Sequence, residues 1–327
     1  MAYPRSVLTD PILGSIHAAM THGENDVPVF QTSLRVMGTT AHITTVGGSP
    51  ELPETLSAFL RKLDGLWSRF RNDSEISRLN NAPDQSVRVS PETLRLFQEM
   101  SWGFSRTAGA FDPTILPALM AEGYTSSLVT PGWETHIPKS SRARGSFTDI
   151  DVQGSTITLP AGTTVDSGGV GKGLAADMAI ELAMSQGALG ALVEVGGDLR
   201  VEGVSPRSDQ WRLAIENPLD PSLRLTVVEL SSQGLATSTI TKRRFMVGER
   251  ETHHIIDPRT ARSALSDTVQ ASVIASTASQ AEMWTKVAFV SGSSQLLTQA
   301  AKHGFHAACL LQDGRWVTSS GWPRSDA

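Results

Sequence analysis

Hydrophobic residues recur at helical spacing in five separate parts of the chain. The clearest run begins at Pro53, after which apolar side chains follow at intervals of three and four residues up to Phe70. Pro53 and Glu54 suit the first turn of such a helix. A second helix is expected after Ser90, a good N-cap residue that is followed by Pro91. The other helical patterns cover residues 175–187, 278–290 and 294–302.

Short apolar runs between turn residues predict β-strands in much of the remaining chain. Residues 32–45 form a β-like stretch, and a hairpin is expected from Phe147 to Leu159 around Gly154. Residues 124–145 are rich in Thr, Ser, Pro and Gly and are expected to form a long loop. Because hairpins are many and βαβ units are few, the pattern favours an α+β fold over a doubly wound sheet. Further strands are expected at residues 191–195, 211–216, 225–230 and 269–275, with a closing hairpin around residues 313–314.

Composition and charge narrow the class of protein. The 327 residues suffice for one large or two medium domains with a full core. A formal net charge of −5 provides no basic footprint, so we expect no nucleic-acid partner. No apolar run approaches the roughly 18 residues of a membrane span, and the N-terminus does not resemble a signal peptide. The single cysteine, Cys309, excludes an intrachain disulfide and is expected in the core. These features favour a cytoplasmic protein without a membrane partner.

The densest cluster of unusual residues runs from Val165 to Gly173. It places four glycines and Lys172 within seven residues, directly before a helical pattern. Small residues let a ligand approach the backbone, and the N–H groups at a helix start attract phosphate. The run matches neither the Walker pattern nor the dinucleotide-binding fingerprint. We interpret it as a phosphate cradle of another kind, the alternative being a plain turn between a strand and a helix.

Two further clusters contain residues that could bind a ring or move a proton. Phe111 and Asp112 lie between a glycine and a proline and could hold the polar edge of a planar ligand, or could serve as a core residue and a turn cap. His254 has an ordinary pKa close to neutrality and is a candidate general base. The alternative is a structural histidine beside an Asp-Pro turn at Asp257. The His-His-x-x-Asp pattern does not fit zinc, because no cysteine or third histidine stands at a useful spacing.

Acidic residues are scattered through these clusters. If they meet at a phosphorylated ligand, their charges repel it. Such a site needs a cation, which would be Mg²⁺ or a well-placed lysine. The acids concerned are Asp112, Asp166, Asp177, Asp198, Asp257 and Glu282.

In their order along the chain, these clusters resemble the ApbE family, the FAD:protein FMN transferases. The resemblance covers about residues 32–320 and rests on the number and order of motifs, each of which is weak alone. It sets a flavin transferase domain at 32–320 between a poorly ordered lead, residues 1–31, and a tail, residues 321–327. The matching stretches are residues 37–39, 67–80, 110–114, 166–177, 195–198, 236–238, 254–260 and 281–292.

The resemblance implies a fold and a reaction. The fold would be a duplicated T-fold-like α+β arrangement, in which antiparallel sheets are backed by helices and FAD lies between the two halves. The enzyme would transfer the FMN part of FAD to a Thr or Ser hydroxyl of a target flavoprotein, with release of AMP. Family members use Mg²⁺. Such phosphoryl transfer depends mainly on positioning and on the neutralisation of charge.

The resemblance also implies roles for individual residues. His254 would deprotonate the acceptor hydroxyl and contact FAD, and Asp257 would be a second catalytic residue. The candidate metal ligands are Gly169, Glu282 and Thr285. The other positions implied to bind FAD are Met37, Gly38, Thr39, Ala110, Phe111, Asp112, Asp166 and Lys172.

The chain departs from the family pattern at the metal site. The family has Ala-Asp followed four residues later by Thr, whereas here Glu282 and Lys286 take these positions. Thr285 is one residue off, which is about 100° around a helix. One interpretation is an i,i+4 pair in which the Lys286 ammonium replaces part of the metal charge. Another is an altered metal site, with FAD binding but without efficient transfer. Hydrolysis of FAD to FMN and AMP is a further alternative.

Overall fold

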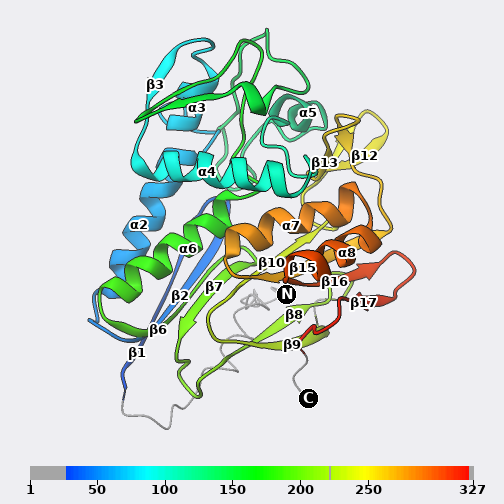
Figure 1. Cartoon of the computed structure of the whole chain (residues 1–327). Coiled ribbons are helices and arrows are strands. Elements are labelled where there is room, and N and C mark those ends of the chain that lie inside the picture. The colour runs from blue at the N-terminus through cyan, green and yellow to red at the C-terminus, as the bar shows by residue number, and fades with distance from the viewer. Residues whose placement is uncertain (1–26, 221, 324–327) are drawn as a thin grey trace, which may run out of the picture.

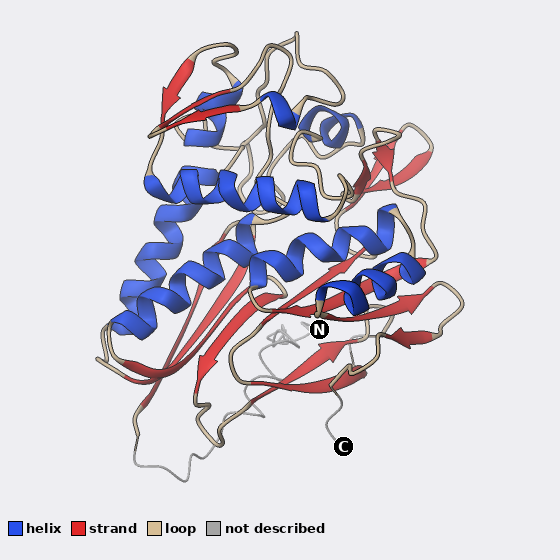
Figure 2. Ribbon diagram, in the orientation of Figure 1, coloured by secondary structure: helices blue, strands red, loops and turns tan. Residues whose placement is uncertain are grey.

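The computed structural model describes residues 27–220 and 222–323, and its centre is an eight-stranded sheet (Figures 1 and 2). The strand order is β1-β2-β6-β7-β10-β15-β16-β17, and every neighbouring pair is antiparallel. The strands are β1 (Val29–Val36), β2 (Thr39–Gly47), β6 (Ala188–Val195), β7 (Asp198–Gly203), β10 (Gly234–Thr239), β15 (Thr268–Ala275), β16 (His306–Leu311) and β17 (Trp316–Thr318).

Helices cover one face of this sheet in two groups (Figure 1). In the first group, α6 (Gly171–Ser185) packs on β6 and β7, and α2 (Leu52–Trp67) packs on β1 and β2. In the second group, α7 (Ala278–Val290) packs on β10 and β15, and α8 (Ser293–His303) packs on β16. This repeated arrangement of antiparallel strands backed by helices confirms the α+β fold and agrees with the duplication implied by the resemblance.

The opposite face of the sheet is covered by a hairpin, so the central strands are buried on both sides. The hairpin consists of β8 (Trp211–Glu216) and β9 (Arg224–Leu230). Its apolar side chains form one cluster with residues from the sheet, and Trp211 is among the buried members. Strand β15 is buried along its whole length, although its sequence alternates between polar and apolar residues from Thr268 to Val273.

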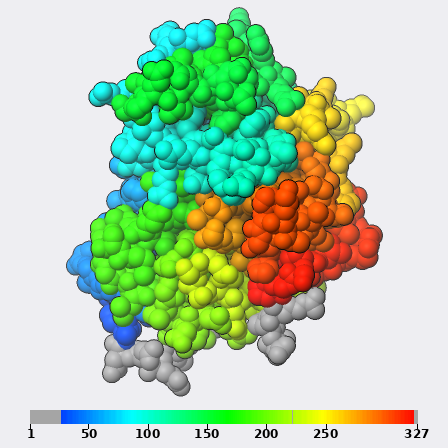
Figure 3. Space-filling model, viewed as in Figure 1, coloured from blue at the N-terminus to red at the C-terminus, as the bar shows by residue number. Residues whose placement is uncertain are grey.

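A smaller part of the molecule lies on top of the helical layer, coloured cyan to green in Figure 3. Beside it stand two short hairpins, β11–β12 and β13–β14, coloured yellow in Figure 1. The elements are α3 (Glu75–Asn80), β3 (Ser86–Arg88), α4 (Pro91–Arg106), α5 (Leu116–Ala121), η1 (Phe147–Asp149), β4 (Asp151–Gln153), β5 (Thr156–Thr158), β11 (Arg244–Val247), β12 (Arg250–His253), β13 (Ile256–Asp257) and β14 (Arg262–Ser263).

All five helices expected from hydrophobic spacing are present. Helix α4 begins after Ser90, whose Oγ accepts a hydrogen bond from the Thr93 N–H, as the N-cap prediction requires. Cys309 is fully buried in strand β16, so the expected packing position is confirmed. Among the described residues, none of the helices has the length and apolar character needed to cross a membrane.

The local structure differs in detail from the expectations at three places. The β-like stretch at residues 32–45 is present but forms two strands, because Met37 and Gly38 take positive φ angles of 51° and 72° and turn the chain into the β1–β2 hairpin. The first strand of the hairpin expected at residues 147–159 is in part a 3₁₀ turn. The strands that were not expected are β3, β7, β10, β11, β12, β13 and β14.

Two expected domain boundaries also shift. Strand β1 begins at Val29, so residues 29–31 belong to the sheet, while residues 1–26 of the expected lead lie outside the described residues. At the other end, Trp322 is buried edge-on against Trp316, so it is part of the core. Residues 324–327 of the expected tail lie outside the described residues.

Candidate active site

The candidate site is built where helices α6 and α7 cross. The Asp177 carboxylate of α6 accepts hydrogen bonds from the N–H groups of Ala278 and Ser279 at 2.8 and 2.9 Å and so caps the start of α7. One turn earlier on the same helix, a Cβ atom on Gly173 would lie 2.5 Å from the carbonyl oxygen of Ala278. Only glycine permits this close approach, which brings Lys172 of α6 next to Glu282 of α7.

A buried network of three charges follows from this crossing. Lys172 Nζ lies 2.6 Å from Glu282 Oε1 and also pairs with Asp198 at the start of β7. The second oxygen of Glu282 accepts the N–H of Gly173 at 2.8 Å. Part of the helix start that was expected to be open to phosphate is therefore already bound by a carboxylate.

The protonation of this network reflects burial and mutual charge. Burial raises the pKa of Asp198 to about 6, and the charge of Glu282 acts in the same direction. Burial also opposes the ionisation of Glu282, but the charges of Lys172 and Lys286 outweigh it and lower its pKa. For Lys172, the two carboxylates outweigh burial and raise the pKa, so the ammonium is retained.

Lys286 lies beside this network but does not pair with the Glu282 carboxylate. Its Nζ donates to the backbone carbonyl of Glu282 at 2.9 Å, to Thr285 Oγ1 at 3.1 Å and to Ser238 Oγ at 3.2 Å. The expected i,i+4 side-chain pair was therefore wrong, because Lys172 takes the Glu282 carboxylate. On its other side, Lys286 Cε would be 3.6 Å from a Cβ atom placed on Gly169.

The three candidate metal ligands do not fit a divalent cation. Both carboxylate oxygens of Glu282 have partners, and Thr285 Oγ1 donates to the Glu282 carbonyl at 2.7 Å. The side chain of Lys286 lies between Thr285 and Gly169, where its ammonium would repel Mg²⁺. Within residues 27–220 and 222–323, no cluster of three acidic, histidine or cysteine side chains could hold a metal ion.

Two adjoining cavities open around the network. The inner cavity has a volume of about 310 Å³ and the outer cavity about 320 Å³, within the usual range for small-molecule sites. Lys172 and Asp166 line both, so the two form one continuous cleft. The inner cavity is lined by these predicted site residues: Gly38, Thr39, Ala110, Phe111, Asp112, Asp166, Gly169, Lys172, His254 and Glu282.

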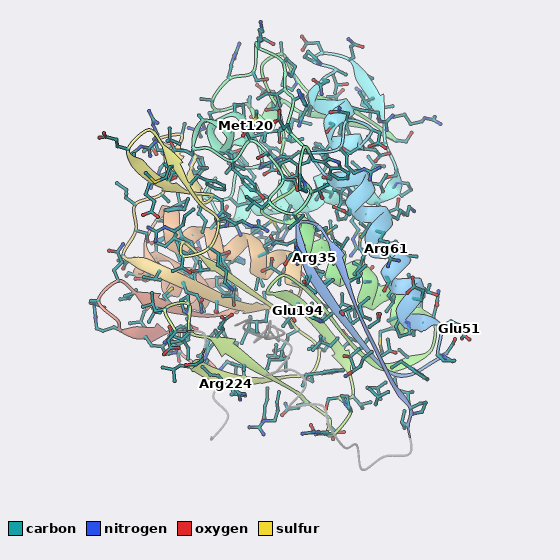
Figure 4. All side chains as sticks on the ribbon, turned by 180° about the vertical axis from the view of Figure 1, so that it is seen from behind. Arg35, Glu51, Arg61, Met120, Glu194 and Arg224 are labelled. Atoms are coloured by element: carbon teal, nitrogen blue, oxygen red, sulfur yellow. The ribbon has the colours of Figure 1, made fainter. Side chains whose placement is uncertain are left out.

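Aromatic side chains and one buried arginine dominate the outer cavity. Arg69 donates to Asp166 Oδ2 and to the Tyr124 carbonyl, each at 3.1 Å, and its guanidinium lies 4.3 Å from the Tyr124 ring centre. Met37 lines this cavity from the tip of the β1–β2 hairpin, near Arg35, which Figure 4 labels. The sequence motif at residues 67–70 contained Arg69, but only the fold shows that it holds Asp166 in place.

His254 lines the inner cavity and is half-buried. Among the described residues, its Nδ1 has no hydrogen-bond partner. Burial lowers the pKa of His254 well below its ordinary value, and the cations Arg243 and Lys286 lower it further. The imidazole is therefore neutral at pH 7 and can accept a proton.

Two predicted site residues lie away from the cleft. Asp257 is outside both cavity linings in the described part of the chain, and it binds Arg259 through its two oxygens. Thr285 also lies outside both linings and points toward Ser238. A catalytic role for Asp257 and a metal-binding role for Thr285 stay predictions of the resemblance, without support from this geometry.

Asp112 and Phe111 shape the end of the inner cavity. Asp112 Oδ1 accepts hydrogen bonds from the N–H and the hydroxyl of Thr114 at 2.8 and 2.7 Å, which fixes the carboxylate in a turn. Phe111 is buried and packs so close to Gly169 that a Cβ atom there would be 2.9 Å from the ring. Asp112 is therefore the polar group of this pair that a ligand could contact.

The cleft holds two half-buried ammonium groups and a neutral histidine, a set of groups that suits a phosphate-bearing ligand. The chain belongs to the ApbE family, whose family model matches residues 37–311. A relative from Salmonella typhimurium, named FAD:protein FMN transferase, is 26% identical over 298 residues, which are 86% of this chain and 83% of the relative.

Solved structures show the same fold. The ApbE protein of Thermotoga maritima matches with a TM-score of 0.79 at 24% identity, over 90% of this chain and 97% of that one. The flavin transferase ApbE of Vibrio cholerae matches with a TM-score of 0.76 at 25% identity, over 90% of this chain and 98% of that one.

Proposed function

We propose that this chain transfers the FMN part of FAD to a Thr or Ser hydroxyl of an acceptor flavoprotein and releases AMP. The observation that carries the proposal is the position of His254, a neutral base that lines the same cavity as Lys172 and Lys286. The activity in the printed name of the Salmonella typhimurium relative supports the same chemistry.

The residues of the cleft can assist each bond change in this reaction. The acceptor hydroxyl oxygen attacks the phosphorus on the FMN side of the diphosphate, and the bond from that phosphorus to the bridging oxygen breaks. The electron pair of this bond leaves with AMP, and the hydroxyl proton passes to His254. Lys286 offsets the negative charge on the phosphate oxygens, since a preorganised cation acts strongly in a site shielded from water.

FAD binding would use the whole cleft. The inner cavity holds the ammonium groups and so suits the diphosphate, while the outer cavity offers aromatic faces and Arg69 for a planar ring system. Mg²⁺ is not part of this proposal, because the donor set does not fit it. The cytoplasmic location stays a prediction from the sequence.

Replacement of the base tests the proposal. His254→Gln keeps a hydrogen-bonding side chain but cannot accept a proton at neutral pH, so AMP release and flavin attachment to the acceptor should fall by about 10²–10⁴-fold. His136→Gln, at an exposed position outside both cavities, is the matched control and should be fully active. Flavin attachment can be followed by intact mass and AMP by chromatography.

The pH dependence of the transfer rate, measured in the same assay, identifies the group that accepts the proton. Because the pKa of His254 is lowered, the base is active above that value, and activity should fall only when the pH drops below about 6.5. The small residual activity of His254→Gln should lack this acidic limb. An unchanged rate and profile in His254→Gln would show that another group accepts the proton.

A further inference from the structure

We propose that Lys286 is the built-in counter-cation of the transfer step, so that the reaction runs without a divalent metal ion. This inference rests on the proposed function, and it concerns how the developing phosphate charge is neutralised. The side chain of Lys286 lies among Gly169, Glu282 and Thr285, the three residues that the resemblance assigns to a metal.

The surroundings of Lys286 match an ammonium better than Mg²⁺. An ammonium has three donor protons, and Nζ of Lys286 has three oxygen partners at 2.9–3.2 Å, from Glu282, Thr285 and Ser238. Mg²⁺ demands a near-octahedral set of oxygens at about 2.0–2.1 Å, including carboxylates. Both oxygens of the Glu282 carboxylate are used by Lys172 and Gly173.

The partners of Lys286 can be exchanged, whereas those of Lys172 cannot. Lys172 is held by two carboxylates, which bind an ammonium more strongly than neutral groups do. Two of the three partners of Lys286 are the hydroxyls of Thr285 and Ser238, which lie 2.8 Å apart and can bond to each other. Exchange of a neutral hydroxyl for an anionic phosphate oxygen is favourable, so Lys286 can turn to the ligand when it enters.

The charges around the inner cavity also indicate that Lys286 acts as the counter-cation. Lys172 carries one positive charge, and its two ionised partners Asp198 and Glu282 carry two negative ones, so this group alone has an excess of negative charge. A diphosphate entering the inner cavity would be repelled by that excess. Lys286 lines the same cavity and restores neutrality before the ligand arrives.

The direct test compares transfer by the full-length wild-type protein in excess EDTA and in millimolar Mg²⁺, with FAD and an acceptor domain. Equal rates of flavin attachment, within about twofold, are expected. Rates that vanish in EDTA and return with Mg²⁺ overturn the inference while leaving the transferase function intact. Absence of attachment under both conditions overturns the proposed function and the inference together.

Variants at Lys286 add a second readout. Lys286→Met keeps the apolar stem, removes the charge and should slow transfer about 10²–10³-fold, with or without Mg²⁺. Lys302→Met, in the last turn of α8, removes an exposed lysine and is the matched control with unchanged transfer.

Binding of Mg²⁺ itself can be measured by calorimetry, which does not depend on turnover. The wild-type protein should show no binding of Mg²⁺ in the millimolar range, whereas Lys286→Thr, which removes the ammonium and supplies a hydroxyl, should bind it. If the wild-type protein binds Mg²⁺ and the Glu282→Gln variant does not, the ion and not the Lys286 ammonium occupies the position among Gly169, Glu282 and Thr285. That result would overturn the inference.

Discussion

Gly173 lies where α6 and α7 cross, and a single added methyl group there should separate the two helices. In Gly173→Ala, the new Cβ would lie 2.5 Å from the carbonyl oxygen and 2.6 Å from the carbonyl carbon of Ala278, and 2.7 Å from the nitrogen of Ser279. All three are backbone atoms, and Asp177 holds them in place. Because ordinary contact begins near 3.4 Å, α7 would have to move by roughly 0.7–0.9 Å.

Two opposing effects determine how much Gly173→Ala lowers the free energy of unfolding. Overpacking of a tight contact costs about 1–3 kcal/mol, and backbone neighbours that cannot rotate away set the cost near the upper end. Replacement of glycine by alanine within a helix stabilises the helix by at most about 1 kcal/mol. The free energy of unfolding should therefore fall by about 2 kcal/mol.

Urea unfolding, followed by circular dichroism, measures this loss. The matched control is Gly65→Ala in α2, where a Cβ atom would meet nothing within 4 Å, so only the helix term acts and the protein should gain about 0.5–1 kcal/mol. The free energy of unfolding is expected to fall in Gly173→Ala and to rise in Gly65→Ala. If Gly173→Ala is as stable as the wild type, or is stabilised like Gly65→Ala, the close crossing of α6 and α7 is refuted.

Two further predictions concern buried charges. Glu122 is buried and bound by arginines, Arg250 first among them, which lower its pKa from the usual 4.5 to about 2. Because the folded-state pKa is lowered, the ionised Glu122 stabilises the fold fully above pH 4.5, and this effect is lost as the pH falls toward 2. The free energy of unfolding measured in urea should therefore fall by about 2 kcal/mol between pH 6 and pH 3. Glu122→Gln should lack this contribution. Arg69→Met should reduce the free energy of unfolding by about 3 kcal/mol because it leaves a partly buried carboxylate without its cation. Arg61→Met, which breaks an exposed pair with a carboxylate and is labelled in Figure 4, should cost less than about 1 kcal/mol, and equal losses in the two variants would contradict this account.

The elements that the sequence predicted well are those whose pattern is local. Helix α2 has a clear apolar stripe and a proline in its first turn, and both features act within a few residues. Strand β10 was missed because its run of small residues, Gly234–Thr239, has neither alternation nor strong hydrophobicity. It is a strand because β7 and β15 pair with it on both sides, and tertiary pairing of this kind leaves no local signal.

The same distinction applies to the site. The resemblance implied site roles for Asp166, Lys172, His254 and Glu282, and all four line the inner cavity, while their roles stay predictions. The pairing of charges within it could not be predicted, because Lys172 reaches Glu282 from 110 positions away and displaces the local partner Lys286. Local spacing indicates which side chains can meet, but competition among buried charges decides which ones do.

The reaction proposed for this chain joins FMN to a protein hydroxyl and releases AMP. The most direct test is the molar ratio of acceptor-bound FMN to released AMP, measured by intact mass and chromatography after incubation of the protein with FAD and a flavoprotein domain carrying a flavinylation Thr. A ratio of one is predicted, with the mass gain lost when that Thr is replaced by Val. Release of AMP with free FMN and no gain in acceptor mass would contradict the claim and show that water is the acceptor.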